Sequence, residues 1–177
     1  MTTVVTGATG FIGANVVRAL LHAGQTVRVL VRPTSDLGNL QGLAVERVHG
    51  DLGDVVSLRA ALQGCHTLYH VAAHYSLWTP DPDAMYATNV EGTATLFQCA
   101  LEMGVARVVY TSSVATIGLP ADGSPGDETL WLLPEQAIGH YKRSKILAEQ
   151  RTLALCDKGL PVVVVNPSAP IGAWDIK

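Results

Sequence analysis

Apolar residues follow two alternating patterns along the chain. Short runs rich in valine predict buried strands at residues 2–5, 26–31, 44–49, 67–72, 107–111 and 161–166. Between them, apolar residues recur every three to four positions and predict helices at about 11–23, from Asp54 to Gly64, and at about 83–103 and 139–157. Strands that alternate with helices predict an α/β protein with a Rossmann-type, doubly wound parallel sheet in a single domain over residues 1–177.

Composition narrows the class of protein. Hydrophobic residues make up 48% and charged residues 15% of the chain, as expected for a parallel sheet covered on both faces. A net charge of −3 provides no basic surface, so we expect no nucleic-acid partner. No apolar run reaches the ~20 residues of a membrane span, and no signal peptide opens the chain. A cytoplasmic protein is therefore expected.

The cysteines and histidines do not form the pattern of a metal site. Cys65, Cys99 and Cys156 are odd in number and far apart, which predicts buried reduced thiols rather than a disulfide framework. His70 and His74 end a predicted strand, and no third or fourth ligand accompanies them. We expect no bound metal.

A glycine-rich loop follows the first strand. Gly7, Gly10 and Gly13 lie in VVTGATGFIG, between a strand and a helix. Without Cβ atoms the backbone can turn tightly and approach a pyrophosphate, and the helix N-terminus offers free N–H groups to its oxygens. Three glycines can also serve only the backbone angles of a turn. Their place at the start of an α/β chain favours dinucleotide binding.

The end of the second strand bears on the choice of cofactor. An NAD site typically has Asp or Glu about twenty residues beyond the loop, where it bonds the ribose 2′-hydroxyl. This chain has Arg32 there, which suits a 2′-phosphate and favours NADP, with NAD as the alternative. Arg32 can also be a solvated strand-end residue, and Asp36 can turn back toward the ribose. Asp51, after the third strand, is placed to reach the adenine or to cap its turn.

Tyr141 and Lys145 are four residues apart in the last predicted helix and share one face of it. A nearby lysine cation stabilises a phenolate and lowers its pKa from about 10 toward the range useful in acid–base catalysis. Ser112 and Ser113 end the preceding strand, at the sheet edge where ligands bind in this fold. His74, Tyr75 and Trp78 can line the substrate side of the cleft, and Trp131 can belong to a lid or to the surface.

Seven motifs appear in the order seen in one family: TGATGFIG, GDL, VAA at 71–73, NVEGT at 89–93, VVYTSS at 108–113, YKRSK at 141–145 and NPS at 166–168. The chain therefore resembles the extended short-chain dehydrogenases/reductases (the NAD-dependent epimerase/dehydratase family). Within that family, VRVLVRP, AAHYSLWTPDP and GHYKRSK look most like hopanoid-associated sugar epimerases and dihydroflavonol-4-reductase-like proteins.

The resemblance implies roles for individual residues. Tyr141 would be the acid/base, Lys145 would lower its pKa and hold the nicotinamide ribose, Ser113 rather than Ser112 would orient the reacting oxygen, and Asn89 would support the site. The residues implied to contact the cofactor are Gly7, Thr9, Gly10, Phe11, Ile12 and Gly13 at the pyrophosphate, Arg32 at the adenosine ribose, Asp51 and Leu52 at the adenine, and Ala72, Ala73, Pro167 and Ser168, with Tyr141 and Lys145, along the nicotinamide side.

The resemblance also sets the expected function. It implies an NAD(P)-dependent oxidoreductase that reduces a ketone or oxidises a secondary alcohol. The alternatives are a sugar-nucleotide epimerase or dehydratase, and a non-catalytic NADP(H)-binding module. Family members are usually longer, and most of their substrate pocket follows the sixth strand, so we expect a truncated chain that lacks the C-terminal substrate subdomain. Pairing of two copies through the long helices is a further expectation.

Overall fold

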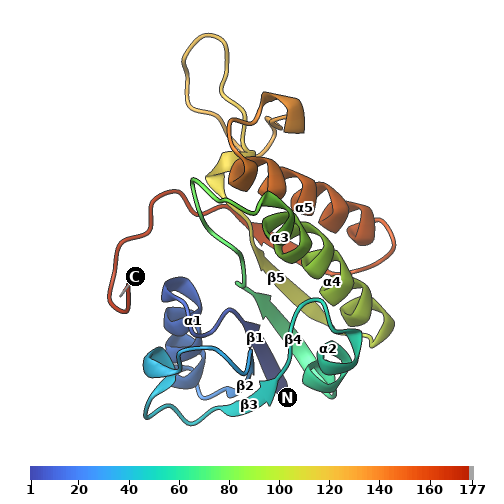
Figure 1. Cartoon of the computed structure of the whole chain (residues 1–177). Helices are drawn as coiled ribbons and strands as arrows, with labels where there is room; N and C mark the ends of the chain where they lie inside the picture. Colours follow the sequence, from blue (N-terminus) through green and yellow to red (C-terminus); the bar gives the residue numbers. More distant parts are fainter. Residues whose placement is uncertain (176–177) are drawn as a thin grey trace.

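The valine-rich segments become the strands of one parallel sheet (Figure 1). The structure is a computed structural model, and it describes residues 1–175. The strand order is β3-β2-β1-β4-β5-β6, and every pair of neighbours is parallel. The strands are β1 (Thr2–Thr6), β2 (Thr26–Val31), β3 (Glu46–His49), β4 (Cys65–His70), β5 (Arg107–Thr111) and β6 (Val162–Val165). The predicted Rossmann-type fold is confirmed.

Helices cover the two faces of the sheet unequally (Figure 1). The helix α1 (Phe11–His22) lies on one face. The other face is covered by α2 (Val55–Leu62), α3 (Pro82–Tyr86), α4 (Thr93–Glu102) and α5 (His140–Cys156).

Neighbouring residues of β1 show how the strands divide the core. Val4 packs into a cluster with Leu68, Phe97 and other residues beneath α2, α4 and α5. Val5 packs into the second cluster, which includes Val17 of α1. Because successive side chains of a strand point to opposite faces, one apolar run supplies both layers.

Several predicted elements differ from the structure, and β3, for example, begins at Glu46 instead of residue 44. β4 is Cys65–His70 instead of 67–72, because its first residues pair beside Thr2 and the chain leaves the sheet after His70. The single helix predicted at 83–103 consists of α3 and α4 joined by a π-helical turn, Ala87–Gly92. The predicted loop 118–138 contains a short helical turn, Pro134–Gln136, and its Trp131 forms a β-bridge with Ile117.

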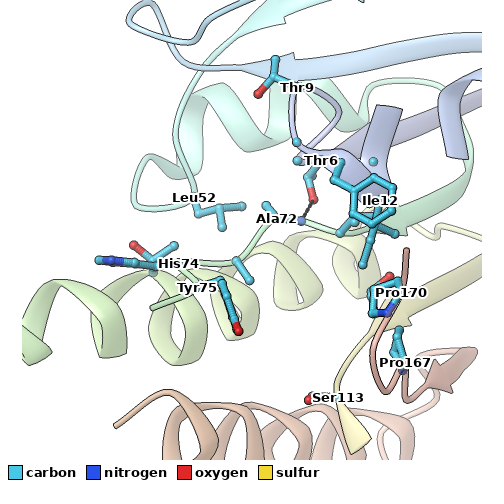
Figure 2. Close-up of a pocket in the computed structure, with 18 of the residues that line it drawn as sticks. Thr6, Thr9, Ile12, Leu52, Ala72, His74, Tyr75, Ser113, Pro167 and Pro170 are labelled. Atoms are coloured by element: carbon cyan, nitrogen blue, oxygen red, sulfur yellow. Dashed lines mark hydrogen bonds between the residues drawn. The ribbon is translucent and has the colours of Figure 1, made fainter. Parts of the chain in front are cut away.

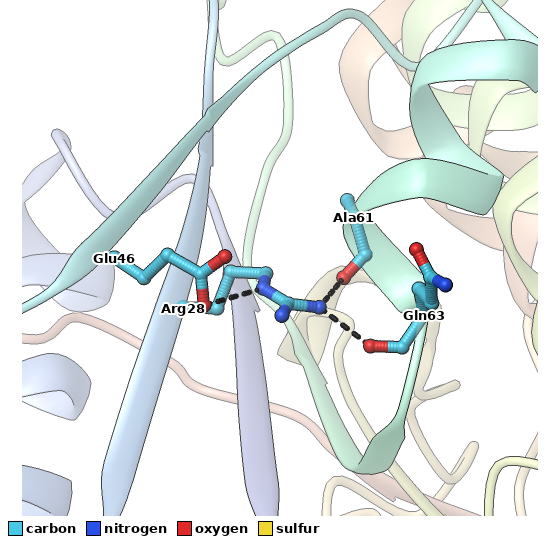
Figure 3. Close-up of polar contacts among 4 residues, drawn as sticks. All are labelled: Arg28, Glu46, Ala61 and Gln63. Atoms are coloured by element: carbon cyan, nitrogen blue, oxygen red, sulfur yellow. Dashed lines mark hydrogen bonds and ion pairs between the residues drawn. The ribbon is translucent and has the colours of Figure 1, made fainter.

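Arg28 of β2 contacts both β3 and the C-terminus of α2 (Figure 3). Its Nη1 donates to the carbonyl oxygens of Ala61 and Gln63, at 2.9 and 2.7 Å, and so satisfies the C-terminus of α2. Its Nε lies 2.9 Å from the carboxylate of Glu46 in β3. This residue ties α2 to the strands without approaching the candidate site.

The three cysteines are free thiols, as predicted. Cys65 and Cys99 are buried, whereas Cys156 is half-buried. Burial raises the pKa of the Cys65 thiol to about 11. None of the helices within residues 1–175 is long and apolar enough to cross a membrane.

Candidate active site

The carboxyl ends of the central strands open into one cavity of about 960 Å³ (Figure 2). β1 lies between β2 and β4, so the chain diverges to opposite sides of the sheet at this point. Open α/β sheets bind ligands in the crevice at such a switch point. The cavity reaches from the glycine loop and the ends of β2 and β3 to the start of α5.

The structure brings nearly all of the predicted site residues to this cavity. Asn89 alone among them does not line it. The predicted residues along the walls are Gly7, Thr9, Gly10, Phe11, Ile12, Gly13, Arg32, Asp51, Leu52, Ala72, Ala73, Ser113, Tyr141, Lys145, Pro167 and Ser168.

The glycines of the loop have different steric environments. At Gly7 φ is +70°, and a Cβ there would lie 2.5 Å from the amide nitrogen of Ala72. At Gly13 a Cβ would lie 2.1 Å from the carbonyl oxygen of Gly7. At Gly10 the nearest atom would be 3.5 Å away, which is an ordinary contact. Gly7 and Gly13 are therefore required by the packing of the loop, whereas Gly10 leaves open space toward the cavity.

The end of β2 presents a cation rather than a carboxylate. Arg32 lines the cavity and is exposed, and Ser35 and Asn39 lie on the same wall. Asp36, the alternative for a ribose hydroxyl, instead accepts the backbone N–H of Gly38 at 2.8 Å. Asp51 lines the cavity and also accepts the N–H of Gly53 at 2.9 Å, so its side chain caps the turn.

Ser112 and Ser113 face different surroundings. Ser112 is buried, and its hydroxyl donates to the carboxylate of Glu149 in α5. Both serines line the cavity, and the hydroxyl oxygen of Ser113 accepts the N–H of Ala115 at 3.1 Å. This arrangement supports Ser113 as the residue that contacts a reacting oxygen.

Tyr141 lies against Tyr75, with the two rings edge to face and their centroids 4.8 Å apart. Burial raises the pKa of Tyr141, the Ser113 side chain lowers it, and Tyr75 adds a smaller rise. The sequence predicts a lowered pKa, but the Lys145 ammonium is directed elsewhere. Its Nζ donates to the carbonyl oxygen of Thr111 at 2.9 Å. At neutral pH the Tyr141 phenol is thus protonated.

Lys145 is almost fully buried at the base of the cavity, with 2% of its surface exposed. Burial lowers the pKa of its ammonium to about 8, and the carboxylate of Glu149 opposes this effect. A pKa of about 8 leaves most of the lysine cationic at neutral pH.

Asn89 acts from behind the cavity wall. Its Oδ1 accepts the N–H of His74 at 2.7 Å, and its Nδ2 donates to the carbonyl of His74 at 3.0 Å and to the hydroxyl of Ser144 at 2.9 Å. Ser144 in turn donates to the carbonyl of Tyr141 at 2.7 Å. Asn89 therefore connects the loop after β4 to the helix that carries Tyr141 and Lys145.

The segment after β6 supplies cavity residues that sequence reasoning missed. Trp174 and Asp175 lie on the wall near the glycine loop. Asn39 donates to the carbonyl oxygens of both Thr9 and Trp174, at 3.1 and 3.2 Å. The guanidinium of Arg18 lies 3.6 Å from the centroid of the Trp174 ring. No local sequence pattern predicts that the chain returns to the glycine loop here, because each contact joins residues far apart in sequence.

The cavity fits a dinucleotide by its own features. It combines a loop where Gly10 leaves room for a pyrophosphate, a cation at the β2 end and a buried lysine at the far end. By contrast, residues 1–175 contain no group of three or more His, Cys, Asp and Glu side chains that could hold a metal ion. His70, buried between Thr6 and Thr93, bonds the hydroxyls of both instead.

Comparison with known proteins agrees with this geometry. A protein of Synechocystis sp. described as "Putative dihydroflavonol 4-reductase" is 53% identical over 98% of this chain and 50% of its own length. The crystal structure of gox2253 is 52% identical and superposes with a TM-score of 0.94 over 99% of this chain and 53% of that one. This chain thus spans about half the length of the curated relatives that it matches.

A more distant structure was solved with the cofactor. The UDP-glucose 4-epimerase of Thermus thermophilus, in complex with NAD, is 26% identical and has a TM-score of 0.83 over 99% of this chain and 60% of that one. The model of the NAD dependent epimerase/dehydratase family matches residues 3–177. The chain therefore belongs to the NAD dependent epimerase/dehydratase family, the extended short-chain dehydrogenases/reductases.

Proposed function

We propose that this chain is the cofactor-binding part of an NADPH-dependent reductase that converts an uncharged, apolar ketone into a secondary alcohol. The observation that carries the proposal is the convergence of Ser113, Tyr141 and Lys145 on the same cavity as the glycine loop. A purely nucleotide-sensing module, the alternative of another class, has no use for a phenol and a buried cation beside a serine hydroxyl.

Ser113, Tyr141 and Lys145 would each have a separate role in the reduction of a carbonyl group. A reduced nicotinamide, when bound in this cavity, would supply a hydride to the carbonyl carbon of a ketone. Ser113 donates a hydrogen bond that orients the carbonyl oxygen, and the phenol of Tyr141 gives that oxygen its proton. The Lys145 cation would hold the nicotinamide ribose, and the Ser113 side chain, which lowers the pKa of Tyr141, would stabilise the phenolate that remains. Because burial raises the pKa of Tyr141, the phenol begins protonated, as reduction requires.

Arg32 supports NADPH rather than NADH. Its guanidinium can pair with a 2′-phosphate, and Asp36, the carboxylate nearest in sequence, is engaged with the backbone of Gly38. We expect NADPH to bind more tightly than NADH to the chain, and Arg32→Ala to weaken NADPH at least tenfold while changing NADH little. Titration followed by nicotinamide fluorescence measures both constants. Equal affinities in the parent chain would contradict the choice of NADPH.

The segments that follow β4 and β5 argue for an apolar substrate over a sugar nucleotide. The segments 71–81 and 117–138 contain Asp and Glu but no Lys or Arg. They expose the side chains of Tyr75, Leu77, Trp78, Leu119, Leu130, Trp131, Leu133 and Ile138, and of these Tyr75 lines the cavity. A diphosphate would meet carboxylates there, whereas an apolar ketone would bury hydrocarbon surface.

Substrate binding can be tested on the chain loaded with NADPH. Saturation-transfer NMR should detect an aryl ketone and fail to detect UDP-glucose. Where turnover is measurable, the ketone should consume NADPH, and Tyr141→Phe should abolish that consumption while leaving NADPH affinity within twofold. An epimerase would bind the sugar nucleotide and show no net oxidation of the cofactor. Unchanged turnover by the Phe variant would remove Tyr141 from the mechanism.

We also propose that two copies pair through α4 and α5, as the family resemblance implies. The outer surfaces of these helices carry Gln98, Glu102, Gln150 and Arg151. Sedimentation equilibrium should give the mass of a dimer, and Gln150→Glu with Gln98→Glu should reduce it toward that of a monomer. A monomer at all concentrations would exclude the pairing.

A further inference from the structure

Lys145 carries a buried charge with few conventional partners. Its ammonium donates to the carbonyl oxygen of Thr111, and no carboxylate among residues 1–175 lies within ion-pair distance of it. Glu149, one turn along α5, accepts hydrogen bonds from Ser112 and Asn166. A buried ammonium with a single acceptor is strongly disfavoured unless something else stabilises it.

The aromatic ring of Tyr110 is that additional partner. The Nζ atom of Lys145 lies over this ring, 4.8 Å from its centroid. The face of an aromatic ring is electron-rich and attracts a cation, most strongly where water is excluded. Tyr110 is buried, with 1% of its surface exposed, and its hydroxyl has no hydrogen-bond partner among residues 1–175. Tyr110 therefore interacts with Lys145 through the face of its ring and not through its hydroxyl.

Neighbouring side chains hold this ring in place. His70 stacks on it with the centroids 5.6 Å apart and the planes 15° from parallel, and Phe97 packs edge to face at 5.5 Å. His70 is itself fixed, because its Nδ1 lies 2.7 Å from the Thr6 hydroxyl and its Nε2 lies 2.9 Å from the Thr93 hydroxyl. Lys145 thus rests on a rigid aromatic support that begins at the strand before the glycine loop.

We propose that Tyr110 is a positioning residue whose ring face keeps the Lys145 ammonium charged and fixed at the base of the cavity. The proposal rests on the proposed function for the role of Lys145, but the interaction exists without substrate or cofactor. The other titratable groups near Lys145 are Tyr141 and Glu149 on α5 and His70 on β4. Burial and the Lys145 charge lower the pKa of His70 to about 3, so His70 stays neutral near the titration of the lysine.

The test is a direct titration of Lys145 in the chain itself. The sequence contains only Lys142, Lys145, Lys158 and Lys177, so the ¹³Cε signals of labelled lysine can be resolved and Lys145→Met assigns the relevant one. Tyr110→Phe keeps the ring and should leave the pKa of Lys145 at its parent value. Tyr110→Leu removes the ring and should lower that pKa by roughly half to one unit.

Phe97→Leu is the matched control, because it removes a ring from the same aromatic cluster that does not face Lys145. It should leave the pKa of Lys145 unchanged. If Tyr110→Leu does not fold, pentafluorophenylalanine placed at position 110 by amber suppression replaces it. That ring has nearly the same volume and a reversed quadrupole, so it should also lower the pKa.

The outcomes separate this proposal from the proposed function. A Lys145 pKa that stays the same or rises in both ring variants overturns the role of Tyr110. A fall in the pKa with NADPH affinity unchanged at pH 8.5 supports the aromatic support but contradicts the role of Lys145 in holding the cofactor. A fall in the pKa together with weaker NADPH binding at that pH, and parent affinity at pH 6.5, supports both.

Discussion

Gly10 and Gly13 belong to the same turn, yet the missing Cβ has a different consequence at each. A Cβ on Gly13 would collide with the backbone of Gly7, while one on Gly10 would meet no atom closer than 3.5 Å. Gly13→Ala should therefore lower the free energy of unfolding by more than about 2 kcal/mol and abolish NADPH binding. Gly10→Ala should keep the parent stability and still lose at least tenfold in affinity, because the methyl group occupies the path of the pyrophosphate.

Urea denaturation and fluorescence titration measure the two effects separately. Gly24→Ala serves as a control for strain alone, since Gly24 has φ +72° with no atom within 4 Å of its Cβ and lies far from the cavity. Parent affinity in Gly10→Ala would show that the cofactor does not approach this part of the loop.

For single residues, the sequence predicts chemical roles more readily than it predicts which groups surround each side chain. The spacing of Gly7, Gly10 and Gly13 marks the loop because its backbone constraints are local. The effect of Lys145 on Tyr141 is misjudged from sequence, because burial and the Thr111 carbonyl decide where the ammonium points. Asn39 and Trp174 give no signal at all, since their roles depend on contacts between distant segments.

At the scale of elements, His70 makes the β1–β4 pair sensitive to acid. Burial lowers the pKa of His70 from 6.5 to about 3. Between those values the unfolded chain binds a proton that the folded chain does not, so stability falls as pH falls from about 6.5 toward 3. The loss contributed by His70 approaches about 1.4 kcal/mol per pH unit.

His70→Gln removes this titration. At pH 7.5 the variant should be less stable than the parent, because the bonds to Thr6 and Thr93 are weakened. The difference between the two chains should shrink steadily in urea denaturation at pH 6.5, 5.5 and 4.5. A difference independent of pH would mean that His70 is not buried as a neutral ring.

The π-helical turn between α3 and α4 has a specific task. It brings Asn89 against His74 and Ser144, and Gly92 lets the turn pass Leu52, since a Cβ there would lie 2.7 Å from the Leu52 Cβ. Asn89→Ala should lower the free energy of unfolding by about 2–3 kcal/mol, because it removes three hydrogen bonds from a buried side chain. The free energy of opening that hydrogen exchange measures at the His74 amide should fall by a similar amount.

Ser144→Ala is the control for this prediction. It removes the hydroxyl contact but leaves both bonds between Asn89 and His74, so the His74 amide should keep its protection. Loss of protection in both variants would indicate general loosening of α5.

The periodicity of residues 83–103 predicts helix correctly but not the π-turn, because an extra residue in one turn does not change which side chains are apolar.

For the whole molecule, the strand–helix alternation predicts the topology well, and the reason is physical. Each β–α–β connection in a parallel sheet has one favoured hand, so six strands and their helices leave few arrangements. The parallel register also brings all strand ends to one edge, which is why residues as distant as Gly7, Ser113 and Tyr141 meet. The β-bridge between Ile117 and Trp131 cannot be predicted in this way, because no comparable rule governs the packing of loops.

The rate at which a reagent labels Cys65 in β4 can show whether cofactor binding stabilises the entire fold. Cys65 begins β4, is buried, and has a thiol whose pKa is raised to about 11, so a disulfide reagent should reach it only after the sheet opens. In a Cys99→Ser, Cys156→Ser background, labelling of Cys65 should follow the free energy of global unfolding. NADPH at 100 times its dissociation constant stabilises the folded state by about 2.7 kcal/mol and should slow labelling about 100-fold.

NADH at the same concentration should slow the labelling of Cys65 much less, because Arg32 gives it no phosphate contact. The half-buried Cys156, tested in the complementary Cys65→Ser, Cys99→Ser background, should react quickly with or without cofactor. Cofactor-dependent protection of Cys65 alone would mean that the glycine loop, the central strands and the helices above them unfold together. If NADPH binds by fluorescence but leaves the labelling rate of Cys65 unchanged, β4 opens locally, and the cofactor site is not coupled to the stability of the sheet.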